Sequence, residues 1–149
     1  IIFIKKLGLE PLSQKFNTKY FKKFTKNKKK NIKNLLMEQT FVAGLGNIYV
    51  NEALFISKIH PLRLSNYLKK HEINNLILNI KKVLKFAISK GGSSIRDFQN
   101  TFGKGGNYQQ FFRIYGREDK KCSRIPCKGI IKKIKISNRS SFYCNKCQK

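Results

Sequence analysis

Acidic residues are scarce in this sequence. Seven Asp and Glu stand against 33 Lys and Arg in 149 residues, which gives a formal net charge of +26. An AT-rich genome would enrich Lys, Asn and Ile, but Asp and Glu can also be written with AT-rich codons, so codon bias does not explain the missing carboxylates. A polyanionic partner does explain them. The lysines are spread through the whole sequence and not gathered on one amphipathic helix, which favours nucleic acid over an anionic membrane.

Long apolar runs are also missing. No stretch reaches 18 apolar residues, and no segment has the pattern of a secretory signal peptide. All four cysteines lie between positions 122 and 147. Two disulfides are the alternative interpretation of these cysteines, but they need an oxidising compartment, and nothing else in the sequence indicates one. The two histidines, His60 and His71, are isolated, so we expect neither to be a metal ligand or a catalytic base.

The cysteines form two short pairs. Four residues separate Cys122 from Cys127, and two separate Cys144 from Cys147. Two such pairs supply the four soft ligands that Zn²⁺ binds in a tetrahedron. Isoleucines alternate with lysines between the pairs, then residues 138–140 predict a turn and residues 141–143 a second strand. The sequence therefore predicts a zinc ribbon with a basic turn at its end and one structural zinc ion.

The rest of the chain reads as helical. Apolar residues one helical turn apart predict a short helix over 18–26. A lysine-rich run at 26–31 follows it and is either a solvated loop or a segment lying on a phosphate backbone. Asn31 is expected to cap a helix that ends near position 39. The longest helical pattern begins at Ser65 and stops at the glycines at 91 and 92. Ser93 and Ser94 are expected to cap a further short helix.

A glycine turn stands before another expected helix. Gly44 and Gly46 are free to adopt positive φ, and Asn47 can cap the helix that follows. Backbone N–H groups at a helix start, approached through residues without side chains, can bind an anion. The alternative is a simple connection between two helices. A second glycine-rich stretch, residues 100–108 around Lys104, reads as a loop of the kind that is often functional.

Several of these segments together resemble the bacterial formamidopyrimidine-DNA glycosylase family. The resemblance covers nearly the whole chain in the same order. It rests on these segments: 31–39 (NIKNLLMEQ), 44–55 (GLGNIYVNEALF), 59–61 (IHP), 91–98 (GGSSIRDF), 114–117 (IYGR) and 138–148 (NRSSFYCNKCQ).

The resemblance implies roles for particular residues. Asn47 and Arg139 would hold phosphates on either side of a flipped-out nucleotide, and Arg139 would also donate the proton for δ-elimination. Tyr49 and Lys30 match lesser DNA contacts, and Lys104 lies in the loop that closes over the everted base. The four-residue spacing of the first cysteine pair departs from the family's commoner two-residue spacing. The metal ligands would be Cys122, Cys127, Cys144 and Cys147.

The fold implied is mainly α with a small β part: a helix-two-turn-helix domain followed by a four-cysteine zinc ribbon formed by a β-hairpin. We expect residues 1–12 to be a linker at the end of a missing N-terminal domain, 13–115 the helical DNA-binding domain and 116–149 the ribbon. The family's nucleophile is an N-terminal proline followed by a glutamate. This sequence starts with Ile1 and Ile2, so we expect these residues alone to bind DNA without cutting it.

The function implied is the DNA-binding C-terminal portion of a bifunctional DNA glycosylase and abasic-site lyase in base-excision repair. The whole enzyme would remove 8-oxoguanine and formamidopyrimidines from damaged double-stranded DNA. We expect a monomer in the bacterial cytoplasm, associated with the nucleoid and not with a membrane. Two alternatives stay open: an endonuclease VIII-like enzyme for oxidised pyrimidines, and a non-catalytic zinc-ribbon protein that binds nucleic acid.

Overall fold

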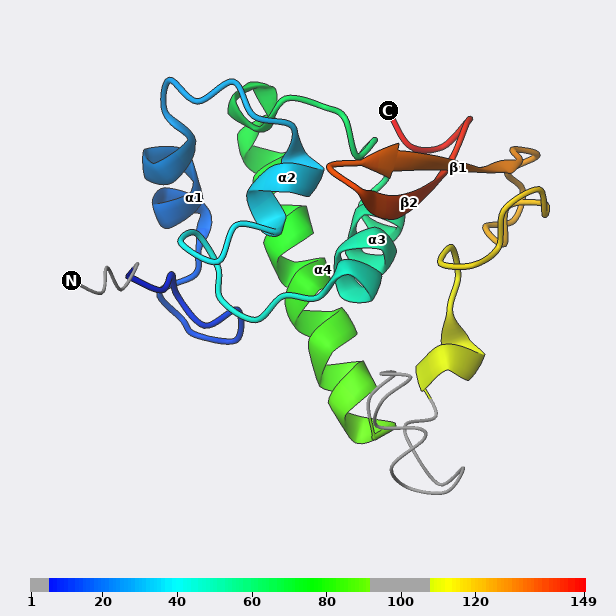
Figure 1. Cartoon of the computed structure of the whole chain (residues 1–149), viewed down its shortest axis with the longest axis horizontal. Helices are drawn as coiled ribbons and strands as arrows, with labels where there is room; N and C mark the ends of the chain where they lie inside the picture. The colour runs from blue at the N-terminus through cyan, green and yellow to red at the C-terminus, as the bar shows by residue number, and fades with distance from the viewer. Residues whose placement is uncertain (1–5, 92–107) are drawn as a thin grey trace.

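The computed structural model describes residues 6–91 and 108–149. Four α-helices lead into one β-hairpin, with two short 3-10 turns between them (Figure 1). The elements are α1 (Thr18–Thr25), α2 (Ile32–Leu36), α3 (Asn47–Ile56), η1 (Ser65–Tyr67), α4 (Lys70–Ser89), η2 (Tyr108–Phe111), β1 (Ile131–Ile136) and β2 (Arg139–Cys144). The expected class, mainly helical with a small β ribbon at the end, is confirmed.

Asparagine side chains start the first two helices. Asn17 Oδ1 accepts a hydrogen bond from the Tyr20 amide at 2.9 Å, and Asn31 Oδ1 accepts one from the Asn34 amide at 2.8 Å. Each bond satisfies one of the amide groups that have no partner inside the first turn of a helix. The predicted cap at Asn31 is therefore confirmed, although α2 ends at Leu36 and not near position 39.

Two expectations about helix starts were wrong. The longest helix begins at Lys70, because residues 65–67 form the separate turn η1. The cap of α3 is Gly46, and Asn47 is the first residue inside the helix. Gly44 does adopt a positive φ of 78°, but Gly46 has a φ of −75°, which any residue can adopt. The short helix expected after Ser93 lies outside the described residues.

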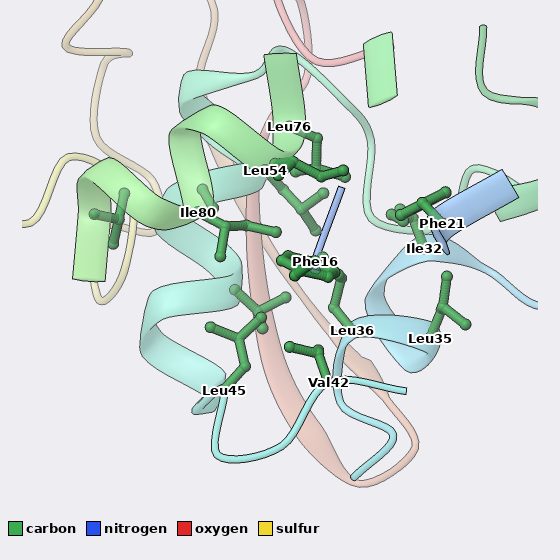
Figure 2. Packing of buried hydrophobic residues seen from close by; sticks show 14 of the residues in the cluster. Phe16, Phe21, Ile32, Leu35, Leu36, Val42, Leu45, Leu54, Leu76 and Ile80 are labelled. Atoms are coloured by element: carbon green, nitrogen blue, oxygen red, sulfur yellow. The ribbon is translucent and has the colours of Figure 1, made fainter. Parts of the chain in front are cut away.

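The helices share one hydrophobic core. Phe16, Phe21 and Phe41 are fully buried, and the ring of Phe41 packs edge-on against both of the others. Figure 2 shows side chains from α2, α3 and α4 converging on the same volume around Phe16. The apolar positions of α4 that recur at three- and four-residue spacing account for its buried side; they are Ile73, Leu76, Ile77, Ile80, Val83, Leu84 and Ala87.

The ribbon is an antiparallel hairpin with a tight turn. Ile136 pairs with Arg139, so the turn has only two residues, Ser137 and Asn138. Their φ values of 49° and 65° are those of the turn that suits the twist of a two-residue hairpin. The turn was expected at 138–140. Arg139 instead begins β2, directly beside the turn.

A second hydrophobic cluster joins the ribbon to the helices. It contains Phe55 from α3, Ile114 from the connecting segment, and Ile131 and Phe142 from the two strands, together with buried cysteines. The hairpin consequently lies along α3 and its turn points toward α2 (Figure 1). Within residues 6–91 and 108–149, no helix is both long enough and apolar enough to cross a lipid bilayer.

Candidate zinc centre and nucleic-acid interface

The four cysteine thiols converge at the base of the hairpin. Their sulfur atoms all lie within 4.8 Å of one another. Cys122 Sγ and Cys147 Sγ are 3.8 Å apart, and Cys127 Sγ and Cys144 Sγ are 3.6 Å apart. A disulfide needs about 2.05 Å between its sulfurs, so these thiols are not paired as disulfides.

The cluster fits a tetrahedral zinc ion. A Zn–S bond of about 2.3 Å places two sulfurs of a tetrahedron about 3.8 Å apart, which is close to both sulfur–sulfur distances above. Backbone amides also point at the sulfurs, since Gly129 N lies 3.4 Å from Cys127 Sγ and Lys146 N lies 3.5 Å from Cys144 Sγ. A Cβ atom at Gly129 would fall 2.3 Å from Cys144 Sγ, so glycine is required there. The four cysteines supply one structural zinc site.

The thiols differ in acidity when no metal is present. Burial raises the pKa of Cys147 to about 12. Burial acts in the same direction at Cys144, but hydrogen bonds from the backbone N–H groups of Cys147 and Lys146 and from the Cys147 and Cys127 thiols together lower the pKa of Cys144 to about 7. Zinc binds the deprotonated thiolates, so binding releases protons and zinc affinity falls as the pH is lowered.

The start of α3 is held against the hairpin. The Asn47 side chain does not cap α3, because Gly46 holds the cap position and Asn47 is the first residue of the helix; its Nδ2 donates instead to the carbonyl oxygen of Ser140 at 3.1 Å. Gly46 makes no side-chain cap bond either. The start of α3, which lies against the hairpin, is the end of the helix that carries partial positive charge.

Arg139 follows the turn of the hairpin and is exposed. Among the described residues its guanidinium has neither a hydrogen-bond partner nor an ion-pair partner. Ser140, the next residue, is the one that accepts from Asn47. The structure thus brings Asn47 and Arg139, which are 92 positions apart in the sequence, to neighbouring positions on one surface.

A buried lysine lies behind the same strand. Lys33 is only 1% exposed, and its Nζ donates to Ser141 Oγ at 2.6 Å. No carboxylate pairs with it in the described parts of the chain. Burial, and next the charge of Arg139, lower the pKa of Lys33 to about 8. Lys33 and Arg139 are thus two neighbouring cations, and within residues 6–91 and 108–149 neither forms an ion pair with a carboxylate.

The residues that hold the hairpin and the connecting segment to α3 were not predicted from the sequence. Asn51 accepts from the Phe142 amide at 2.7 Å through its Oδ1. Glu52 accepts from the amides of three consecutive residues, 113–115, at 2.8 to 3.0 Å. Both side chains are 1% exposed. The one available signal was two adjacent polar residues in the middle of an otherwise apolar helix.

Burial raises the pKa of Glu52, and the three backbone amides and the nearby Arg113 act in the opposite direction. The buried carboxyl group therefore holds the connecting segment at residues 113–115 to α3.

The other three predicted DNA contacts are Lys30, Tyr49 and Lys104. Lys30 forms an ion pair with Glu38, with 2.9 Å between Nζ and Oε1. Tyr49 is half-buried on α3 and lines a cavity with Leu84 and Ala87 of α4. Lys104 lies outside the described residues. Of the predicted DNA contacts that are described, Asn47 and Arg139 are the two that the structure links, through the bond from Asn47 to Ser140.

The charges near the start of α3 are all positive: the exposed guanidinium of Arg139, the ammonium of Lys33 and the positive end of the helix dipole. Arg139 directly precedes Ser140, whose carbonyl oxygen is bonded to the first residue of α3, and its charge is close enough to Lys33 to lower the pKa of that lysine. Arginine binds phosphate well because its planar fork of N–H groups can donate two hydrogen bonds at once. The zinc centre lies at the opposite end of β2, at Cys144, and has all four positions filled by sulfur, so it supports the hairpin and is not a site of chemistry.

Comparisons with known proteins match both the helical part and the ribbon to described domains. Residues 7–99 match the formamidopyrimidine-DNA glycosylase H2TH domain, and residues 119–149 match a zinc finger found in FPG and IleRS. The chain is 43% identical over 145 residues to the formamidopyrimidine-DNA glycosylase of Aliivibrio fischeri, covering 97% of this chain and 53% of that protein. The chain spans about half the length of the curated relatives it matches.

Solved structures give the same result. The structure superposes on the Lactococcus lactis Fpg bound to abasic-site DNA with a TM-score of 0.85 and 42% identity, covering 97% of this chain and 52% of that one. A complex of the Lactococcus lactis FPG with FAPY-dG-containing DNA also gives a TM-score of 0.85 at 42% identity, with the same coverage of each chain.

Proposed function

Because the chain belongs to the formamidopyrimidine-DNA glycosylase family, we propose that it is the DNA-binding C-terminal portion of a base-excision-repair enzyme. The whole enzyme would act as a glycosylase on oxidised purines, 8-oxoguanine and formamidopyrimidines, and as a lyase on the abasic site. The catalytic N-terminal half of the family would supply the nucleophile. The predicted boundaries at 13–115 and 116–149, a monomeric state and a location on the bacterial nucleoid in the cytoplasm are part of the same proposal.

The observation that carries the proposal is the pairing of Asn47 with the hairpin that bears Arg139. A base inside a duplex cannot be reached, so such an enzyme has to hold a kinked backbone and an extruded nucleotide, at an unstacking cost of a few kcal/mol. Charge-assisted hydrogen bonds from Arg139, together with contacts from the first turn of α3, would offset that cost. By the resemblance, Arg139 also donates the proton in δ-elimination.

The other contacts have a smaller part in the proposal. Lys30 would exchange its partner Glu38 for a phosphate, which costs little because exposed ion pairs contribute only about 0 to 1 kcal/mol. Tyr49 would support the start of α3, since its ring packs 3.4 Å from the position of a Cβ on Gly46. Lys104 would bind DNA from the loop that closes over the everted base, as the resemblance implies.

The test compares three DNA duplexes and one variant. We expect gel-shift titration to show tighter binding to abasic-site and 8-oxoguanine duplexes than to intact duplex. Arg139→Ala should weaken binding to the abasic-site duplex at least severalfold, because the guanidinium contact is lost, while zinc content stays the same.

The matched control is Lys132→Ala. Lys132 is an exposed cation of β1 that pairs with Tyr143, away from the turn, so this change removes the same charge without touching the proposed contact. Equal affinity in Arg139→Ala and Lys132→Ala would refute the contact. Equal affinity for all three duplexes would instead favour a zinc-ribbon protein that binds nucleic acid without recognising damage.

A further inference from the structure

Arg124 lies within the first cysteine pair and contacts both the zinc centre and helix α3. Its Nη1 donates to Cys147 Sγ at 2.8 Å. Its Nη2 donates to the carbonyl oxygen of Phe55 at 2.7 Å and approaches that of Ile56 at 3.4 Å. The guanidinium carbon is 4.4 Å from the centroid of the Phe55 ring. A single side chain therefore joins a thiol of the second cysteine pair to the last turn of α3.

The groups around Arg124 all attract a cation. One zinc dication with four thiolates keeps an excess of negative charge. The last carbonyls of a helix have no donor within the helix and carry partial negative charge. A guanidinium can serve a sulfur and a carbonyl at the same time because its N–H groups point in several fixed directions, and it can also lie over an aromatic ring.

The spacing of the first cysteine pair positions this side chain. The Cys127 amide donates to the carbonyl oxygen of Arg124 at 2.7 Å, which closes a turn between the two residues. The four residues between Cys122 and Cys127 give the backbone room to present Arg124 toward α3 while both cysteines remain in the cluster.

We propose that Arg124 is a positioning residue that couples zinc retention to docking of the ribbon on α3. Loss of its side chain would weaken both at once. At its other end, α3 is joined to the same hairpin by the bond from Asn47 to Ser140. Helix and hairpin are thus fastened at both ends, which keeps Arg139 from pivoting relative to α3. The predicted effects of Arg124 on zinc retention and ribbon docking do not depend on DNA binding. Only the predicted effect on DNA affinity rests on the proposed function.

The first test is the rate of zinc transfer from the zinc-loaded full chain to the chromogenic chelator 4-(2-pyridylazo)resorcinol. We expect Arg124→Gln to speed this transfer about 10- to 100-fold, the range by which outer-shell changes alter metal affinity. Arg124→Lys keeps the charge but has one compact ammonium that cannot reach both Cys147 and Phe55, so its rate should lie between those of the parent and Arg124→Gln.

The matched control is Lys128→Gln. Lys128 is an exposed cation directly after Cys127, so this change removes one charge even closer along the chain to a zinc ligand than Arg124 is. Its transfer rate should equal that of the parent. Equal rates for Arg124→Gln and Lys128→Gln would overturn the inference. If Arg124→Gln fails to fold, Arg124→Lys decides, and a parental rate in that variant would show that charge alone suffices.

Amide hydrogen exchange separates docking from a local effect on the thiolate. The Lys149 amide donates to Lys58 O and the His60 amide donates to Lys149 O, both at 3.1 Å, which joins the C-terminal end of the ribbon to the segment after α3. Zinc-loaded Arg124→Gln should exchange both amides several times faster than the parent. Unchanged exchange there would reduce Arg124 to an electrostatic partner of Cys147 and would overturn the docking role.

Binding to the abasic-site duplex is measured last. Arg124→Gln that releases zinc faster and exchanges faster should also bind this duplex severalfold more weakly. A failure of Arg139→Ala to weaken binding would count against the proposed function, whereas the zinc and exchange results would still decide the role of Arg124.

Discussion

Burial of the Lys33 ammonium next to the proposed phosphate site is electrostatically unfavourable in the free protein. A buried ammonium usually has a carboxylate partner, because leaving a charge unpaired away from water is unfavourable. Lys33 instead donates to a neutral hydroxyl, and Arg139 is close enough to lower its pKa. A phosphate bound by Arg139 would supply the missing negative charge. The lysine is therefore expected to cost stability in the free protein and to favour the anion-bound form.

The pH dependence of stability tests this account. The pKa of Lys33 falls from 10.5 to about 8 on folding. Between these values the unfolded chain holds more protons than the folded one, so the contribution of Lys33 to the free energy of unfolding rises with pH. At about 1.36 kcal/mol per unit, the full penalty is roughly 3 kcal/mol, present below pH 8 and relieved toward pH 10.5.

Urea denaturation of zinc-loaded protein at pH 7 and pH 10 measures the effect. We expect the stability of Lys33→Met relative to the parent to fall by about 2 kcal/mol between the two pH values, since only the parent gains from deprotonation. Lys85→Met, which removes an exposed lysine of α4, serves as the control and should show no such change. A pH-independent difference for Lys33→Met would mean that Lys33 ionises as freely in the folded protein as in the unfolded chain.

Between elements, α3 and β2 are joined by polar side chains as well as by apolar packing. Asn51 is central, since its Oδ1 accepts from the Phe142 amide and its Nδ2 donates to the carbonyl oxygen of Asn47 at 2.9 Å. It thereby supports the same residue that reaches Ser140. A buried asparagine that satisfies groups on both elements fixes how the hairpin lies on the helix.

We expect Asn51→Leu to lower the free energy of unfolding by about 1 to 3 kcal/mol, because the buried Phe142 amide loses its acceptor. Urea denaturation of zinc-loaded protein provides the measurement. Asn75→Leu is the control, since Asn75 is exposed on α4 and the change should be close to neutral or slightly stabilising. Similar stability of the two variants would show that the Phe142 amide finds another acceptor, and that Asn51 does not fix the docking.

The limits of sequence-based prediction follow from these same elements. Cysteine spacing, the alternation of isoleucine and lysine, and the cap at Asn31 are local signals, and they placed the zinc centre, the hairpin and α2. The partner of Asn47 is not local. The motif suggested a cap, but Asn47 lies inside the helix and its Nδ2 donates to the carbonyl oxygen of Ser140, 93 positions away. The roles of Lys33, Asn51 and Glu52 were missed for the same reason, because each depends on the packing of separate elements.

For the whole molecule, the two hydrophobic clusters predict two units of unequal stability. The helical cluster combines side chains from all four α-helices, whereas the ribbon cluster has few apolar residues, and its centre is made of cysteines. Structural zinc supplies roughly 10 to 16 kcal/mol of binding free energy in zinc-finger peptides, far more than so small an apolar cluster can. The ribbon should therefore depend on the metal, and the helices should not.

Removal of zinc should unfold residues 119–149 and leave α1 to α4 in place. After exhaustive chelation, with metal loss verified by atomic emission, we expect amide protection to disappear from β1 and β2 while the helical circular-dichroism signal persists. Affinity for the abasic-site duplex should fall at least to the level of Arg139→Ala, because Arg139 is no longer held beside Asn47. One equivalent of zinc should restore both properties. A ribbon that keeps its amide protection without metal would show that apolar packing alone folds it, and zinc would then have no part in holding Arg139.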